Sequence, residues 1–366
     1  SIFTSVPQPI VAVLAFIFVH TFQTYLPFSL GFAAGCMLYV VFAELLPDAL
    51  KDVPSQFLAV ATTASGGRVA TIGYIGVGDM GGAMAGWLAA QDEFDLQVFD
   101  LDADAVAAVV EKGATAAESA ASLAAAAEHI SICVPNDEIV MDVIAGESGI
   151  LESCAPGTTI GIHSTVHPDT VRDAAALAAE REVIVFDAAV GGGTANAEIG
   201  NLSIMVGVPD GGLPPTARAV VESCGGAVFE PGGVGTGAAM KVAFNVMTYF
   251  QQAAASAAHQ IMVGEGADPA QLLEGWRHVG QLGTLTELFW TILDMSADDK
   301  AGPFGDYLKG PIYLAEKDLD LAASLGRETG RPMPVVETVR DAMNLVYGMP
   351  GAGADTGTTT SSEQED

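Results

Sequence analysis

The sequence predicts an α/β protein with a doubly wound parallel sheet, followed by an all-α C-terminal domain and preceded by a hydrophobic helical segment. Three observations predict this architecture. From residue 69 to about 232, apolar β-rich runs alternate with helical stretches, which is the pattern of a parallel sheet covered by helices. From residue 233 to 349 the apolar spacing is helical throughout. Before both, residues 10–46 are almost continuously apolar.

The first 57 residues form a hydrophobic segment that differs from the rest of the chain. Its second apolar run, residues 26–46, is long enough for a membrane span of about 20 residues, and no basic region of a signal peptide precedes it. The run resembles a late helix of ZIP-type metal transporters, but it lacks their histidine- and glutamate-rich metal ligands. We expect a fusion or gene-prediction artefact joined by a linker at 58–68. A membrane tether is the alternative, and a buried hairpin is a third.

Composition excludes several classes of partner. The 366 residues include 45 acidic and 14 basic side chains, which give a net charge of -31 and a pI near 4.2. Nucleic acid and anionic membrane surfaces would be repelled. Half of the residues are hydrophobic, so the acidity indicates a folded, halophilic protein rather than disorder. The 4 cysteines form no metal-binding pattern, which favours free thiols in a reducing, cytoplasmic setting.

A glycine-rich turn follows the first predicted strand. Residues 69–75 form a β-rich apolar run, and a helical stretch begins at residue 83. Between them, Gly76 permits the tight turn, Gly78 lets backbone N–H groups approach a pyrophosphate, and Gly81 lets the helix pack on the strand. The helix N-terminus favours the phosphates. The predicted cofactor contacts here are Gly76, Val77, Gly78, Asp79, Met80 and Gly81.

The second predicted strand ends in a carboxylate. Asp100 lies 24 residues after Gly76 (100 minus 76), where an acid hydrogen-bonds the adenosine ribose hydroxyls. A carboxylate there repels a 2′-phosphate, and no arginine follows to receive one. We therefore expect NAD, with NADP less favoured. The alternative is that Asp100 merely ends a strand.

Two further apolar strands, 129–134 and 158–163, end in polar loops. In a doubly wound sheet, ligands bind beyond the carboxyl ends of the strands. Helix capping would equally explain Asn136 and Thr165. His163 stands out because it ends a strand, although the six histidines are scattered and predict no metal site. The predicted contacts from these loops are Val134, Pro135, Asn136 and Thr165 for the cofactor and Ser164 for the substrate.

Four stretches in order resemble the β-hydroxyacid dehydrogenase family, within the 6-phosphogluconate dehydrogenase superfamily. They are residues 76–85, 187–202, 235–245 and 317–319. The group most like this chain is that of 3-hydroxyisobutyrate dehydrogenase. The resemblance implies an NAD(P)-dependent oxidoreductase that moves hydride between nicotinamide and a small 3-hydroxy acid or its semialdehyde. It also implies a homodimer or tetramer.

Lys241 and Asn245 are the predicted catalytic pair. Alcohol oxidation needs a group that takes the hydroxyl proton, and a desolvated lysine suits that task. Asn245 lies one helical turn later on the same face and would orient the lysine or substrate. The resemblance implies acid/base catalysis for Lys241, and places Lys317 near the cofactor, where it keeps the site closed.

A run of glycines, Gly191, Gly192 and Gly193, would present backbone N–H groups to a substrate carboxylate. A flexible turn is the alternative. Relatives usually have Pro at position 189, Ser at 191 and Asn or His at 244, whereas this chain has Ala189, Gly191 and Phe244. These departures leave the substrate open and keep a divergent imine or semialdehyde reductase, or a protein that binds cofactor without turnover, as alternatives.

The C-terminal domain is predicted to serve dimerisation and substrate binding. A long helix from about 234 to 263 would join the domains, followed by helices near 269–277, 283–297, 311–326 and 333–347. Its large aromatic residues are expected in the core or a dimer interface, with some lining the substrate pocket. The acidic tail, residues 350–366, is expected to be disordered.

Overall fold

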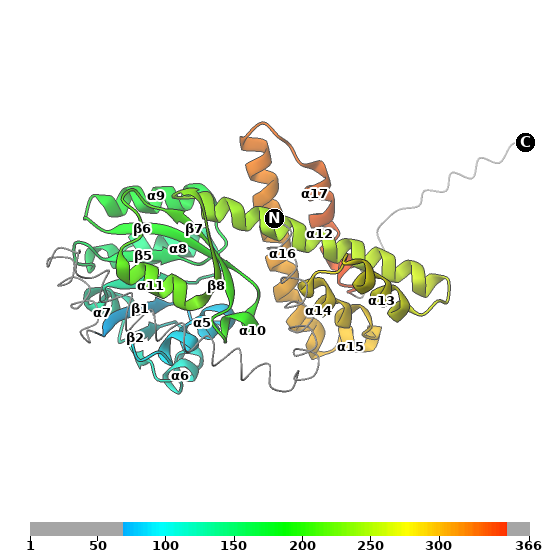
Figure 1. Ribbon diagram of the computed structural model, residues 1–366, viewed down its shortest axis with the longest axis horizontal. Helices are drawn as coiled ribbons and strands as arrows, with labels where there is room; N and C mark the ends of the chain where they lie inside the picture. The colour runs from blue at the N-terminus through cyan, green and yellow to red at the C-terminus, as the bar shows by residue number, and fades with distance from the viewer. Residues whose placement is uncertain (1–68, 350–366) are drawn as a thin grey trace, which may run out of the picture. The chain divides into compact units, whose positions relative to one another are not determined.

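The computed structural model describes residues 69–349 (Figure 1). They form a sheet domain, residues 69–233, and a helical domain, residues 236–349. The expected transporter-like segment, the linker and the acidic tail lie outside these residues. Among the helices of residues 69–349, none is both long and apolar enough to cross a membrane.

The sheet domain contains an eight-stranded sheet in the order β3-β2-β1-β4-β5-β6-β7-β8. The first six strands are parallel, and their order is that of dinucleotide-binding folds. The strands are β1 Ala70–Ile75, β2 Phe94–Phe99, β3 Thr115–Ala116, β4 His129–Ile132, β5 Thr159–Ile162, β6 Ile184–Gly191, β7 Leu202–Val208 and β8 Gly225–Gly233.

The sheet departs at one edge from the predicted parallel arrangement. β7 pairs with β6 in antiparallel fashion, while β7 and β8 are parallel to each other. A parallel crossover needs about a dozen residues or more, and residues 192–201 between β6 and β7 are too few for one. The chain therefore turns back beside β6 and carries the glycine run around this turn.

Helices cover both faces of the sheet. Alternation along β1 places Ile72 and Tyr74 in the core under α5 and α11, and Ile75 in the core under α7, α8 and α9. Every residue of β4 and β5 is buried, as expected of a parallel sheet covered on both sides. The helices are α5 Asp79–Ala89, α6 Ala103–Val110, α7 Ala120–Ala126, α8 Asp137–Ala145, η3 Ile150–Glu152, α9 Pro168–Ala179, α10 Thr194–Ala197 and α11 Pro215–Cys224.

The helical domain is built on two long helices, α12 and α16, which pack against each other (Figure 1). α12 contacts β6, β7, β8 and α9 of the sheet domain and α13, α14, α17 and α18 of the helical domain. It therefore joins the two domains, as predicted. The helices are α12 Thr236–Gly264, α13 Pro269–Val279, α14 Thr284–Leu293, α15 Ala297–Ala301, α16 Pro303–Glu328, α17 Pro334–Asp341 and α18 Met343–Val346.

Three predicted helix boundaries are wrong. α16 begins at Pro303 rather than near residue 311, because Gly302 and Pro303 start a helix that continues through Pro311. An internal proline removes one backbone hydrogen bond, and burial of Leu308 and Ile312 in the helical core compensates for that loss. The helix expected at 283–297 ends at Leu293. The last helix is divided into α17 and α18.

Candidate active site

The glycine turn between β1 and α5 has the shape that a pyrophosphate requires. Gly76 has a φ of +86°, and a Cβ added there would lie 2.4 Å from the Cys133 carbonyl oxygen. A Cβ on Gly81 would lie 2.0 Å from the Gly76 carbonyl oxygen. At Gly78 an added Cβ would meet nothing within 4 Å. Two of the glycines are thus required by the fold, while Gly78 leaves open space beside the N-terminus of α5.

Asp100 lies next to this turn at the end of β2. Its Oδ2 accepts the Val77 N–H at 2.7 Å, and its Oδ1 accepts the Asp102 N–H at 2.9 Å. These bonds orient the carboxylate beside the glycine turn, and each oxygen keeps a lone pair for a further donor. Asp79 and Met80, also predicted as cofactor contacts, occupy the first turn of α5. The turn and the carboxylate together fit a dinucleotide.

The loops after β4 and β5 bring the other predicted contacts together. Ser164 Oγ accepts the Val134 N–H at 2.9 Å, so this buried hydroxyl joins the ends of the two strands. The Asn136 side chain caps α8 by accepting the Ile139 N–H, which is the capping role that the sequence left open. Thr165 does not cap α9, because His167 does. Pro135, in the loop after β4, is exposed.

The start of α12 is tied to β6 by Asp187. The two oxygens of this buried carboxylate accept the Gly235 N–H at 2.8 Å and the Ala238 N–H at 2.6 Å. Burial raises the pKa of Asp187, while the backbone N–H groups act in the opposite direction. The carboxylate satisfies donors at a helix N-terminus that would otherwise lack partners. It therefore determines where the helix that carries Lys241 leaves the sheet.

A chain of polar contacts runs from Lys241 into the helical domain. Lys241 Nζ donates to Asn245 Oδ1 at 2.9 Å, and Asn245 Nδ2 donates to Asp318 Oδ2 at 2.6 Å. Tyr249 donates its hydroxyl proton to the same Asp318 oxygen at 3.1 Å. Asn245 and Asp318 are 8% and 4% exposed. The predicted catalytic pair is thus in contact, and it is held by an aspartate from α16.

Lys317 connects α16 to the loop after β5. Its Nζ donates to the Thr165 carbonyl oxygen at 2.7 Å. The same Nζ lies 3.1 Å from Asp318 Oδ1, within ion-pair distance, although this buried oxygen has no partner in hydrogen-bond geometry among the described residues. The contact places the predicted cofactor-side lysine where the two domains meet.

Burial brings the pKa of the Lys241 amine towards neutral pH. Burial lowers the pKa of Lys241 from 10.5 to about 8, and the charge of Lys317 adds to this effect, while Asp318 opposes it. Burial and the neighbouring Asp318 carboxylate raise the pKa of Tyr249, which stays protonated as a donor. Because a proton donor and acceptor work best when their pKa lies near the operating pH, Lys241 is suited to take or give one proton.

The glycine run lines a cavity of about 710 Å³ between β6, α12 and α14. Gly192 and Gly193 have φ angles of +126° and +77°. Neither N–H donates a backbone hydrogen bond within residues 69–349. Unpaired N–H groups on a cavity wall are suited to bind an anion. Phe244 lines the same cavity beside Gly191, and its ring centroid is 5.8 Å from Lys241 Nζ.

His163 belongs to a buried hydrogen-bonded chain rather than to the cavity. Its Nδ1 lies 2.8 Å from the Ala188 carbonyl oxygen and its Nε2 lies 3.0 Å from Ser131 Oγ. His129 Nε2 contacts the same hydroxyl at 3.2 Å. Burial lowers the pKa of His129 to about 3 and that of His163 to about 4. Both histidines are therefore neutral and structural at neutral pH.

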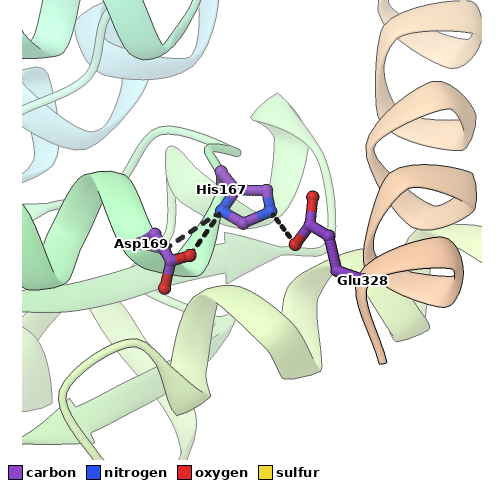
Figure 2. A group of neighbouring side chains, drawn as sticks. All are labelled: His167, Asp169 and Glu328. Atoms are coloured by element: carbon purple, nitrogen blue, oxygen red, sulfur yellow. Dashed lines mark hydrogen bonds and ion pairs between the residues drawn. The ribbon is translucent and has the colours of Figure 1, made fainter. Parts of the chain in front are cut away.

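One histidine with two carboxylates lies between the domains, as Figure 2 shows. His167 Nδ1 accepts the Asp169 N–H at 3.1 Å, and its Nε2 lies 3.0 Å from Glu328 Oε2. Both ring nitrogens are engaged, so neither offers a lone pair to a metal ion. This cluster is a contact between α9 and the end of α16.

Sequence patterns missed three polar residues of the site. Asp187 is the first residue of the motif 187–202 and Asp318 is the middle residue of the motif 317–319, but no role was predicted for either. Tyr249 lies two turns after Lys241, on the same face of α12. The helical spacing of Lys241, Asn245 and Tyr249 was a usable signal. The contact of Asp318 with Asn245 was not, because 73 residues separate them.

Comparison with known proteins shows the family to which this chain belongs. Residues 71–232 match the model of the NAD binding domain of 6-phosphogluconate dehydrogenase. A mitochondrial protein of Dictyostelium discoideum, described as a probable 3-hydroxyisobutyrate dehydrogenase, is 33% identical over 274 residues, which cover 72% of this chain and 81% of that protein. The 3-hydroxyisobutyrate dehydrogenase of Pseudomonas aeruginosa is 31% identical over 276 residues, which cover 75% of this chain and 91% of that protein.

A solved structure supports the same relationship. The 3-hydroxyisobutyrate dehydrogenase of Mycobacterium tuberculosis, determined with L-serine, has a TM-score of 0.63 and 25% identity, covering 76% of this chain and 94% of that one. The fold and site define an NAD(P)-binding oxidoreductase. The chain belongs to the β-hydroxyacid dehydrogenase family, among the proteins like 3-hydroxyisobutyrate dehydrogenase.

Proposed function

We propose that this protein is an NAD-dependent dehydrogenase that interconverts a small 3-hydroxy acid and its semialdehyde, with Lys241 as the acid/base group. The observation that carries the proposal is the series of hydrogen bonds from Lys241 through Asn245 to Asp318. It holds an amine with a pKa of about 8 at 5.8 Å from the ring of Phe244, which lines a cavity with unpaired backbone N–H groups. Relatives named as 3-hydroxyisobutyrate dehydrogenases support the substrate class.

Lys241 would act as a base in the oxidative direction. The neutral amine accepts the hydroxyl proton of the substrate as the alcohol becomes a carbonyl. In the reductive direction the ammonium form returns a proton to the carbonyl oxygen. Asn245 accepts a hydrogen bond from Lys241 and donates one to Asp318, so it fixes the amine without removing its lone pair. Gly192 and Gly193 would bind the substrate carboxylate through their N–H groups.

The cofactor site favours NAD. The bound nicotinamide would supply the hydride acceptor or donor. Asp100 would accept hydrogen bonds from the ribose hydroxyls, and its charge would repel a 2′-phosphate. The next residue, Leu101, is 95% exposed and offers no positive charge to a phosphate. We therefore expect higher kcat/KM with NAD than with NADP.

Replacement of Lys241 tests the proposal. The full-length protein would be assayed for NAD and NADP reduction with a panel of 3-hydroxy acids, at low and high salt because of its acidity. In Lys241→Met, kcat should fall by about 10²–10⁴-fold, while the Kd for NAD stays within a few-fold. The matched control is Lys309→Met, an exposed lysine on α16. Wild-type activity retained in Lys241→Met would refute the assigned role.

The helical domain supports a homodimeric or higher assembly. Several large apolar side chains are exposed on its surface. Burying them between two copies would contribute about 25 cal/mol per Å² of apolar area. Light scattering should give twice or four times the chain mass, and a monomer would refute this part of the proposal. The exposed side chains include Ile261, Val263, Val279, Tyr307 and Val335.

A further inference from the structure

Two residues that line the cavity, Gly191 and Phe244, lie against each other. A Cβ added to Gly191 would lie 3.2 Å from Phe244 Cε1 and 3.5 Å from Met205 Cε. Unlike Gly192 and Gly193, Gly191 has no positive φ, so the backbone does not require glycine there. The Phe244 ring would have to shift by a few tenths of an ångström to admit a Cβ at position 191. The size of the residue at position 191 and the position of the Phe244 ring therefore depend on each other.

Phe244 gives the cavity an apolar wall, and its ring centroid is 5.8 Å from the Nζ of Lys241, which does not itself line the cavity. Phe244 follows Lys241 on the same face of α12 and is 38% exposed. Met247 and Leu288, at 62% and 61% exposure, line the same cavity. Exposed apolar side chains on a concave surface gain free energy when a ligand covers them. The surface is thus suited to an apolar group attached to the substrate.

The uncharged lining and the volume of the cavity further restrict which ligands can bind. No lining residue carries a charge, so a second carboxylate, a sulfonate or an ammonium group on the ligand would lose hydration without a partner. The volume of about 710 Å³ falls in the range of about 300–1,000 Å³ that is typical of larger organic ligands. A four-carbon hydroxy acid would leave most of it empty.

Resting on the function proposed above, we propose that the substrate is a 3-hydroxy acid, or its semialdehyde, with an uncharged apolar substituent larger than methyl at the carbon next to the carboxylate. The carboxylate would lie on the N–H groups of Gly192 and Gly193. The hydroxyl would lie at Lys241. The substituent would lie against Phe244, in the space between α12 and α14.

A series of 3-hydroxypropanoates with hydrogen, methyl, ethyl, propyl and carboxymethyl at carbon 2 tests this with the full-length protein. Each buried methylene should raise kcat/KM about fourfold. The carboxymethyl compound should fall at least tenfold below propyl. No turnover with any member would overturn the proposed function and this inference together. Turnover that is flat or falls with substituent length would overturn the inference alone.

Substitutions of Phe244 and Gly191 test whether these two residues form the apolar wall of the cavity. Phe244→Asn should reduce the propyl-to-hydrogen ratio of kcat/KM at least tenfold, whereas Val279→Asn, an exposed apolar residue outside the cavity, should leave the ratio unchanged. Gly191→Ser should reduce the same ratio in the wild-type background, because its Cβ would displace the ring. Added to Phe244→Asn, it should have little further effect. Equal and additive losses from the two substitutions would show independent positions and contradict the pairing.

Discussion

The cofactor turn and the catalytic helix belong to one compact unit, but they are held in place by different kinds of contact. The turn depends on short-range geometry, since the constraints on Gly76 and Gly81 come from backbone atoms of the turn and of Cys133, the residue after β4. The catalytic helix depends on polar contacts between distant segments, from Asp187 at its start and Asp318 beside its middle. Damage to the turn should therefore act on folding and cofactor binding, and damage to the helix on proton transfer.

The largest expected effect is a difference in stability between substitutions of two glycines of the turn, Gly76 and Gly78. Gly76→Ala forces alanine into a positive φ and towards the Cys133 carbonyl oxygen, which should lower the free energy of unfolding by about 3 kcal/mol. Gly78→Ala meets no atom within 4 Å, so it should leave stability within about 0.5 kcal/mol and weaken NAD binding. Chemical denaturation and calorimetric titration of both variants would measure this. Equal destabilisation by both would contradict the geometry.

A smaller effect is expected at the start of α12. Asp187→Ala removes two hydrogen bonds to buried N–H groups and should lower the free energy of unfolding by about 2 kcal/mol. Because α12 carries Lys241, kcat should fall as well. The matched control is Asp268→Ala, which removes the cap of α13 and should cost about 1 kcal/mol with kcat unchanged. An unchanged kcat in Asp187→Ala would show that its role is limited to stability.

The buried histidines predict a gradual loss of stability in acid. The pKa values of about 3 for His129 and about 4 for His163 in the folded state lie below 6.5, the value in the unfolded chain. As pH falls below 6.5, the unfolded chain binds protons that the folded protein does not. Each histidine should then reduce the free energy of unfolding by up to about 1.4 kcal/mol per pH unit.

Urea denaturation between pH 7 and pH 4.5 measures this slope. His129→Asn should show a shallower pH dependence than the wild type. His278→Asn replaces an exposed histidine of α13 and should keep the wild-type slope. Identical slopes in all three proteins would mean that carboxylates alone account for the loss of stability.

The sequence predicted the parts of this protein that depend on local chemistry. Strand, glycine turn and helix around Gly76 are a local pattern, and the pairing of Lys241 with Asn245 follows from helical spacing. The reversed direction of β7 was not predicted, because alternation of strands and helices does not report the direction of a strand after a short turn. Asp318 was not assigned a role, because its partner Asn245 lies 73 residues away. Long-range contacts leave no spacing pattern in a single sequence.

The pH dependence of alcohol oxidation tests the central claim most directly, namely that Lys241 exchanges the proton. With a saturable 3-hydroxy acid and NAD, kcat/KM should rise with pH and level off above an apparent pKa near 8, because the neutral amine is the base. In Asp318→Asn the apparent pKa should fall, since that carboxylate raises the pKa of Lys241. A profile that is flat from pH 6 to pH 10, or one that is unchanged in Lys241→Met, would contradict the account.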